Sequence, residues 1–219
     1  MAAMAAQHAM APRAAPTKSN PAAPLWLLWI AISITGAVVG ALVAWRIRVL
    51  VVGGPGFLGQ ALSYVATVVN AIILSGAQWF LLRRYRLDVY WWVPATVVAG
   101  LISGIIVIPA MLRLFTAPAG SVISPSTAIL SSALALGASG LIAGTAQALV
   151  LRTSVGKIAL IWVPATTIGS ALAGAATSAV SPHVLGFGLP LSVDLSVLAA
   201  SGALLVAASQ APALLRILR

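Results

Sequence analysis

Long apolar runs, separated by short polar or basic stretches, dominate the pattern of this chain. The runs predict helices at 25–44, 57–82, 89–112, 127–151, 158–180 and 193–215. Each run has about 20 residues or more, and a helix of that length is roughly 30 Å long and can cross a bilayer. The pattern therefore predicts an all-α membrane protein with six transmembrane helices, in one domain that covers residues 25–219.

The first 24 residues differ from the rest because they are rich in Ala and Pro and carry only Arg13 and Lys18 as charged side chains. A segment of this composition cannot bury enough apolar surface to offset the entropy of ordering it. We expect residues 1–24 to form a flexible N-terminal tail.

An internal repeat runs through the apolar part of the chain. The sequence WVPAT opens the third and fifth predicted helices at Trp92 and Trp162, which are 70 residues apart, and a looser version begins at Trp29. The second, fourth and sixth helices end near a glutamine with a small residue three positions before it: Gln78, Gln147 and Gln210. The spacing predicts three tandem two-helix repeats, at about 25–82, 89–151 and 158–216, and internal repeats of this kind occur in many membrane folds. Three copies suggest packing about a pseudo-threefold axis.

The repeated motifs resemble those of a group of uncharacterised bacterial polytopic membrane proteins. In that group a Gly-rich helix ends in G-x-x-Q-W-x-x-L-R, and a start such as G-W-W-V opens the next helix. Here the first copy reads SGAQWFLLR, the second has Ala148 after its glutamine, and the third lacks the tryptophan. The resemblance covers most of residues 25–216. It implies the same membrane architecture and no particular activity.

Basic residues at the ends of the apolar runs predict the orientation of the helices. The chain has 12 Lys and Arg against 2 acidic residues, and its net charge is +10. With six spans, nine basic residues fall on one side: Arg13, Lys18, Arg83, Arg84, Arg86, Arg152, Lys157, Arg216 and Arg219. Arg46, Arg48 and Arg113 fall on the other. By the positive-inside rule, both termini should be cytoplasmic, in a protein of the cytoplasmic (inner) membrane.

Tryptophans near the same helix ends are typical of an aromatic belt at the membrane interface. They are Trp29, Trp79, Trp91, Trp92 and Trp162. Trp92 and Trp162, together with Arg83, Arg84, Arg86 and Arg152, are therefore predicted to anchor the helix ends at the cytoplasmic headgroups. Membrane lipids are the first expected partners.

Small residues spaced four apart place two small side chains on one helix face, which lets two backbones approach closely. The pairs are Gly36 and Gly40, Gly100 and Gly104, Gly140 and Gly144, and Ser170 and Gly174. Helix packing is the favoured interpretation of these pairs. The alternative is a thin wall that lines the path of a solute.

The three glutamines are the candidate site. Gln78, Gln147 and Gln210 lie at equivalent depths, about one turn inside the basic residues. Interhelical hydrogen bonding is the first interpretation, since an amide can donate and accept across helices. If all three face a common axis, they would form a polar ring that could contact a headgroup, a quinone-like carbonyl or a passing solute.

The sequence gives little support to catalysis or to a bound cofactor. It has no cysteine, and His8 and His183 are its only histidines. The segment GASG at 137–140 is similar to the serine motif of rhomboid proteases, but the last predicted helix offers no histidine to act as general base. We expect no metal site, no cofactor and no catalytic residue. The basic residues form helix-end signals rather than one polar face, so nucleic acid is not an expected partner.

Two hypotheses for function remain open. The first is a non-catalytic scaffold or accessory subunit that packs beside other integral membrane proteins, because the loops are short and the spans are nearly free of functional polar groups. The second is a small passive transporter or channel, or a protein that binds a lipid or quinone, and that uses the glutamine region at the cytoplasmic helix ends.

Overall fold

The computed structural model describes residues 22–49, 56–85, 87–115, 124–186 and 190–218, and all of their regular structure is helical. The elements are α1 (Ala22–Val49), α2 (Gly56–Arg84), α3 (Trp92–Ile102), η1 (Ser103–Val107), α4 (Ile108–Phe115), α5 (Pro125–Val155), η2 (Gly156–Ile161), α6 (Trp162–Gly186) and α7 (Leu191–Ile217). The prediction of an all-α chain is confirmed for these residues.

The helices extend somewhat beyond the predicted runs. α1 begins at Ala22, so the last three residues of the expected tail are helical, and it continues to Val49 through Arg46 and Arg48. Residues 1–21 lie outside the described part of the chain. Arginine side chains at a helix C-terminus interact favourably with the helix dipole, which is consistent with this longer α1.

Local sequence signals explain where α5 begins and ends. Ser124 caps the helix, because its hydroxyl oxygen accepts from the backbone N–H of Thr127 at 3.2 Å, and Pro125 follows at the first helical position. At the other end, Gly156 has a φ of 68°, a left-handed conformation that favours glycine. The chain then crosses to α6 through the short 3₁₀ segment η2.

A π-helical segment, η1, joins α3 to α4 without a break in the helical conformation. Pro109 stands at the second position of α4. A proline inside a helix lacks the N–H that would bond the carbonyl four residues earlier, here that of Ile105, and its ring crowds that carbonyl. The π-helical turn that contains Ile105 accommodates this local misfit.

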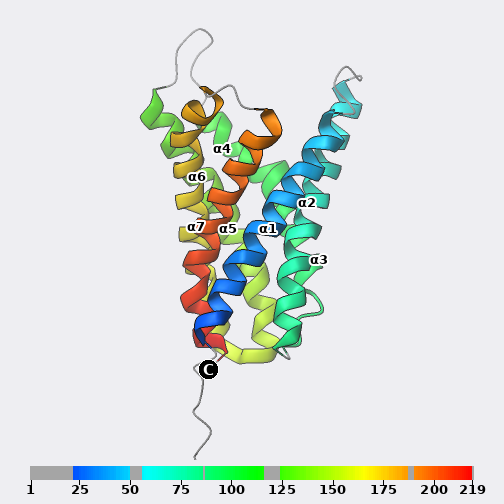
Figure 1. The fold of residues 1–219 in the computed structure, drawn as a ribbon, viewed down its shortest axis with the longest axis vertical. Coiled ribbons are helices and arrows are strands. Elements are labelled where there is room, and N and C mark those ends of the chain that lie inside the picture. Colours follow the sequence, from blue (N-terminus) through cyan, green and yellow to red (C-terminus); the bar gives the residue numbers. More distant parts are fainter. Residues whose placement is uncertain (1–21, 50–55, 86, 116–123, 187–189, 219) are drawn as a thin grey trace, which may run out of the picture.

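The long helices form a closed ring. α1, α2, α3, α5, α6 and α7 each pack against their neighbours in chain order, and α7 also packs against α1. Successive members of the ring run antiparallel, so one end of the bundle holds the start of α1, the end of α7, the α2–α3 turn and η2 (Figure 1). We call this the η2 end.

Five stretches of the described residues are long and apolar enough to cross a membrane. They are Leu25–Val49, Ala61–Arg84, Trp92–Met111, Pro125–His183 and Leu191–Ile217. The fourth has 59 residues and contains α5, η2 and α6 as far as His183. Large apolar side chains such as Phe80 and Ile106 are more than half exposed on the outside of the bundle. The fold is that of a multi-pass membrane protein.

Candidate functional site

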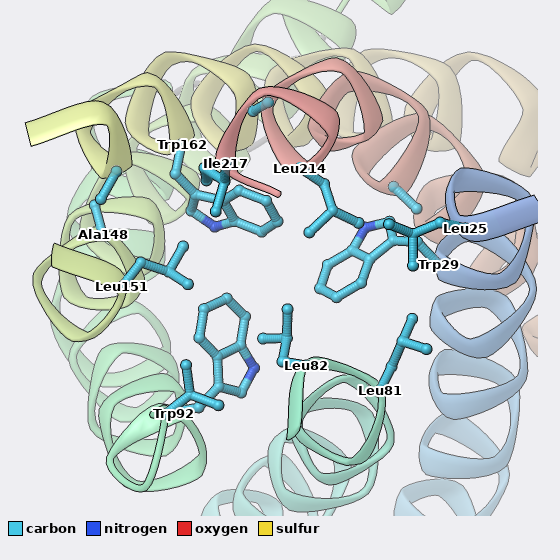
Figure 2. Close-up of a cluster of buried hydrophobic side chains, with 14 residues drawn as sticks. Leu25, Trp29, Leu81, Leu82, Trp92, Ala148, Leu151, Trp162, Leu214 and Ile217 are labelled. Carbon is cyan, nitrogen blue, oxygen red and sulfur yellow. The ribbon is translucent and has the colours of Figure 1, made fainter. Parts of the chain in front are cut away.

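Three indole rings fill the centre of the bundle at the η2 end. Trp29 of α1, Trp92 of α3 and Trp162 of α6 are each 0% exposed. Their ring centroids lie 5.5 to 6.5 Å apart, and each pair packs edge to face at 72° to 81°. Figure 2 shows the three rings converging inside the circle of helices. Edge-to-face contacts bring the positive edge of one ring to the negative face of another, so the cluster is favourable beyond its buried area.

This burial corrects the prediction of an aromatic belt for these three residues. Trp92 and Trp162 cannot anchor the protein at lipid headgroups, because neither side chain reaches the outer surface. The neighbouring Trp91 is 73% exposed and does lie on the outside. Trp92 is the first residue of α3 and Trp91 is the residue before it, so the way the chain enters this helix directs Trp92 inward and Trp91 outward.

Each glutamine donates a hydrogen bond to a hydroxyl on the other helix of its own predicted repeat. The Nε2 of Gln78 donates to Ser33 Oγ at 3.1 Å, that of Gln147 to Thr96 Oγ1 at 3.1 Å, and that of Gln210 to Thr166 Oγ1 at 3.0 Å. In each case the hydroxyl residue follows a central tryptophan by four positions. Residues four apart share one helix face, so the same face of the helix presents both the indole and the hydroxyl.

Two glutamines also accept from the tryptophan of the next repeat. Trp162 Nε1 donates to Gln147 Oε1 at 2.9 Å, and Trp29 Nε1 donates to Gln210 Oε1 at 3.3 Å. The glutamines are only 2% to 5% exposed. These bonds join α5 to α6 and α7 to α1. The glutamines therefore form hydrogen bonds between helices, which was the first interpretation of these residues from the sequence.

A leucine four residues after each glutamine completes the layer: Leu82, Leu151 and Leu214 are at most 1% exposed. Each predicted repeat therefore supplies a tryptophan, a hydroxyl, a glutamine and a leucine to the η2 end. We call this assembly the Trp–Gln layer. Sequence reasoning found the glutamines and missed the inward role of the tryptophans, the hydroxyls and the leucines. The spacing of four residues after Trp29, Trp92 and Trp162 was the available signal.

A cavity of about 470 Å³ lies against the Trp–Gln layer, inside the ring. Its lining comes from α1, α2, α3, η1, α5, α6 and α7, and it includes Gln78 and Gln210 at one end. Along α2 the lining continues from Gln78 to Thr67, a rise of about 16 Å. Sites for small molecules are usually 300 to 1,000 Å³ in volume, so this cavity falls within their range.

The cavity exists because the inward positions become small above the layer. On α1 the inward face reads Trp29, Ser33 and Ala37, and on α3 it reads Trp92, Thr96 and Gly100, at intervals of four residues. The indoles meet in the centre, whereas Ala37 and Gly100 are too short to do so. The space between the helices therefore stays open above the tryptophans.

The lining of the cavity is neutral and mildly polar. It combines hydroxyls from Ser33, Thr96, Ser139, Ser170 and others with amides and with Ala, Gly, Val and Leu side chains. None of the described residues that line it is ionisable. The cavity can therefore accept a neutral molecule with one or two polar groups, and it lacks the charged partner that an ionic ligand would need.

Some of the predicted glycine pairs lie where two helices pack closely, and others line the cavity. A Cβ at Gly36 would lie 3.1 Å from Leu74 Cα, and one at Gly144 would lie 3.2 Å from Val163 Cα. A Cβ at Gly40 would overlap Asn70, and one at Gly174 would overlap the backbone of Ser132. Helices therefore approach closely at these positions.

The pair Gly100 and Gly104 is different. An added Cβ would meet only Ala71 at 3.8 Å and Thr67 at 3.9 Å, which are ordinary contacts, and Gly100 lines the cavity. The remaining two pairs, Gly140 with Gly144 and Ser170 with Gly174, combine both roles. Their first members, Gly140 and Ser170, line the cavity, and a Cβ at Gly140 would also lie 2.5 Å from Ser170 Oγ.

The predicted basic anchors lie on the outside of the η2 end, where Arg83, Arg84 and Arg152 are exposed. The Arg83 guanidinium carbon lies 4.8 Å from the centroid of the Trp79 ring and 5.7 Å from that of Tyr90. Arg86 lies outside the described residues. The exposed positions are compatible with contacts to anionic headgroups, as the sequence predicts.

The residues considered for catalysis do not form a site. The Ser139 hydroxyl donates to the backbone carbonyl of Ala135 at 2.8 Å within its own helix, and His183 is exposed. In the described part of the chain, no group of three or more His, Asp or Glu side chains could hold a metal ion. The Trp–Gln layer and the adjoining cavity are thus the candidate functional site.

Fold and site together define the class as a multi-pass helical membrane protein with a cavity between its helices that is lined by neutral residues. Comparisons with models of protein families, with curated proteins and with solved structures found no match to this chain. The resemblance to uncharacterised bacterial membrane proteins stays a prediction.

Proposed function

We propose that the protein binds a small neutral molecule in the cavity between its helices, as a non-catalytic membrane protein that stores or passively carries this molecule. The observation that supports the proposal is the cavity itself, about 470 Å³ in volume and lined from every helix of the ring. The buried tryptophans fill the centre of the bundle beside it. Because the tryptophans block the centre of the bundle at the η2 end, the cavity fits a binding protein or a carrier better than an open channel.

Cavity filling tests this function. Ala143→Phe places a ring in the cavity from α5, whereas Thr145→Phe places the same ring on the exposed side of the same helix. We expect the wild-type protein and Thr145→Phe, purified in gentle detergent, to carry the same small molecule in mass spectrometry of their organic extracts. Ala143→Phe should carry at least about tenfold less, since a buried clash blocks the site.

Equal amounts of the co-purifying molecule in the two phenylalanine variants would contradict a role for the cavity. The extract of the same membranes without the protein serves as the background. The thermal unfolding midpoint of each variant shows whether Ala143→Phe is still folded.

We also propose that the chain crosses the cytoplasmic membrane six times, as three hairpins about a pseudo-threefold axis, with both termini in the cytoplasm. As one straight helix the stretch Pro125–His183 would be about 88 Å long, far more than one crossing needs, and it is interrupted by η2. Its two halves, α5 and α6, pack against each other. The three glutamine–hydroxyl bonds, each within one predicted hairpin, support the repeat.

This topology predicts the labelling of introduced cysteines, and the chain has none of its own. Lys157→Cys and Leu114→Cys each place a thiol at an exposed position, near opposite ends of the ring. In intact cells, a membrane-impermeant maleimide should label the Leu114→Cys protein and leave the Lys157→Cys protein unlabelled until the membrane is opened. Labelling of both, or the reverse pattern, would rule out this orientation.

The accessory-subunit hypothesis predicts partners among other integral membrane proteins. It is compatible with a ligand-binding role, since a carrier can dock on a larger complex. It stays a prediction, because no feature of the described surface identifies such a partner.

A further inference from the structure

A second cavity, of about 200 Å³, lies between α1, α2 and α7. On α1 its lining extends from Ala41 to Arg48, the last residue but one of the helix, and on α7 it is Leu195, in the second turn. Since α1 begins at the η2 end, these positions lie toward the opposite end of the bundle (Figure 1). We call this space the portal cavity, and the cavity of about 470 Å³ beside the Trp–Gln layer the main cavity.

The portal cavity continues the main cavity along all three helices. Thr67 and Asn70 of α2 line both cavities. On α1 the main cavity is lined by Ala37 and the portal cavity by Ala41, and residues four apart share one helix face. The lining of α7 passes from one cavity to the other at the same interval. The two spaces are therefore successive parts of one path along the inside of the bundle.

Thr67 and Asn70 mark the junction between the two cavities. The Thr67 hydroxyl donates within α2 to the backbone carbonyl of Ser63 at 2.9 Å. Asn70 is different, because its Oδ1 is buried and has no hydrogen-bond partner among the described residues. Its amide packs against Gly40 of α1, where an added Cβ would overlap Oδ1. Since no hydrogen bond holds this oxygen, the side chain can change its rotamer while the helices stay in place, and the junction can widen to let a molecule pass.

The two ends of this path differ. At the η2 end the three central indoles are 0% exposed and fill the middle of the bundle (Figure 2). At the opposite end the lining of the portal cavity includes Trp45, which is half-buried, and Arg48, which is exposed. From Ser33, beside the Trp–Gln layer, to Arg48 the path rises about 22 Å along α1. The path is therefore closed at the η2 end and reaches the surface of the described structure at the other.

We propose that the molecule bound in the main cavity enters and leaves through the portal cavity, past Asn70, and that the indoles prevent its passage through the η2 end. This inference rests on the proposed function and adds the route of the molecule. The protein takes up and releases the molecule at one end only. In the proposed orientation this end faces the non-cytoplasmic side of the membrane.

The test measures how fast a thiol in the main cavity reacts, and it does not require the natural ligand. The chain has no cysteine, and Ala143→Cys places one in the lining of the main cavity on α5. Ala41→Trp fills the portal cavity from α1, whereas Val43→Trp places the same ring at a 44% exposed position of that helix. All proteins are held in lipid nanodiscs and treated with methyl methanethiosulfonate, a small neutral reagent.

Mass spectrometry of the intact protein gives the rate of modification. Ala143→Cys should react, and Val43→Trp should leave its rate unchanged. Ala41→Trp should slow the reaction at least about tenfold, because its ring blocks the route. Leu195→Trp enlarges the facing wall of the portal cavity from α7 and should slow the reaction in the same way. The thermal unfolding midpoint shows which variants are folded, and either of these two is sufficient for the test.

Equal rates in the portal variants and in Val43→Trp would show that the reagent arrives by another route, and the inference would be wrong. A thiol at Ala143→Cys that fails to react while the portal cavity is open would also overturn it, since the path would then be closed. The proposed function is judged separately, by the molecule that co-purifies. A slowed reaction without such a molecule supports the route and contradicts the function, and a co-purifying molecule with equal rates does the reverse.

Discussion

Gly174→Ala is expected to lower the free energy of unfolding by about 3 kcal/mol, the upper part of the usual range for an overpacked core. An alanine Cβ at this position would overlap the backbone carbonyl of Ser132 and would lie 3.1 Å from Leu136 Cβ. A side chain could rotate away, but a backbone carbonyl within a helix cannot. The substitution must therefore push α6 away from α5, and every contact along that interface weakens.

Gly76→Ala is the matched control for this prediction. It adds the same methyl group inside α2, where nothing lies within 4 Å of the new Cβ. Alanine has a higher helix propensity than glycine by about 1 kcal/mol, so this variant should be as stable as the wild type or slightly more so. Reversible unfolding in mixed micelles measures both changes. Equal stability of the two variants would show that α5 and α6 do not pack as closely as described.

Gln147→Leu is also expected to lower the free energy of unfolding strongly. This substitution removes the donor to Thr96 and the acceptor for Trp162, and it leaves the buried indole N–H without a partner. An orphaned buried polar group costs about 1–3 kcal/mol, and the lost bond to Thr96 adds to this cost. Hydrogen bonds within membrane bundles often contribute little free energy. We therefore expect the free energy of unfolding to fall by about 2–3 kcal/mol in total.

Gln78→Leu provides the comparison, because Gln78 has the equivalent place in the layer but accepts no hydrogen bond from Trp92. Gln78→Leu should lower the free energy of unfolding by about 1 kcal/mol, the contribution of one interhelical hydrogen bond. The same unfolding assay gives both numbers. A loss for Gln78→Leu as large as that for Gln147→Leu would mean that the layer is symmetric and that Trp92 is not an open donor.

The helices and the position of the glutamines could be predicted from the sequence because they depend on one-dimensional signals. The length of each apolar run indicates a membrane-crossing helix, and the recurrence of Gln78, Gln147 and Gln210 places them at one depth. The structure confirms helices at these runs, and it brings the three residues to one end of the ring.

The direction of the tryptophans could not be predicted in this way. Trp91 and Trp92 are adjacent and both lie near a helix end, so depth alone assigns both to an aromatic belt. What separates them is the rotation of α3 about its axis, which depends on tertiary contacts such as the bond from Gln147 to Thr96. Because apolar residues cover all sides of the helices, the sequence lacks the amphipathic stripe that would show this rotation.

The cavity could not be predicted from the sequence either. Ala37 and Gly100 are typical of tightly packed membrane helices, and packing was the favoured interpretation of the glycine pairs. Whether a small residue closes an interface or leaves a space depends on what faces it. A Cβ added at Gly36 would lie 3.1 Å from Leu74 Cα, whereas one added at Gly100 would meet only Ala71, at 3.8 Å. Differences of less than 1 Å in the separation of two helices depend on how all the helices of the ring pack together, and the sequence of one helix does not show them.

The most direct test of ligand binding is a density map of the wild-type protein in nanodiscs of its native membrane, at a resolution that shows side chains. We expect density of non-protein origin in the cavity, beside the Gln78 and Gln210 side chains that line one end of it. The contrary result is a closed bundle, in which the helices have moved together and no space remains above the indoles.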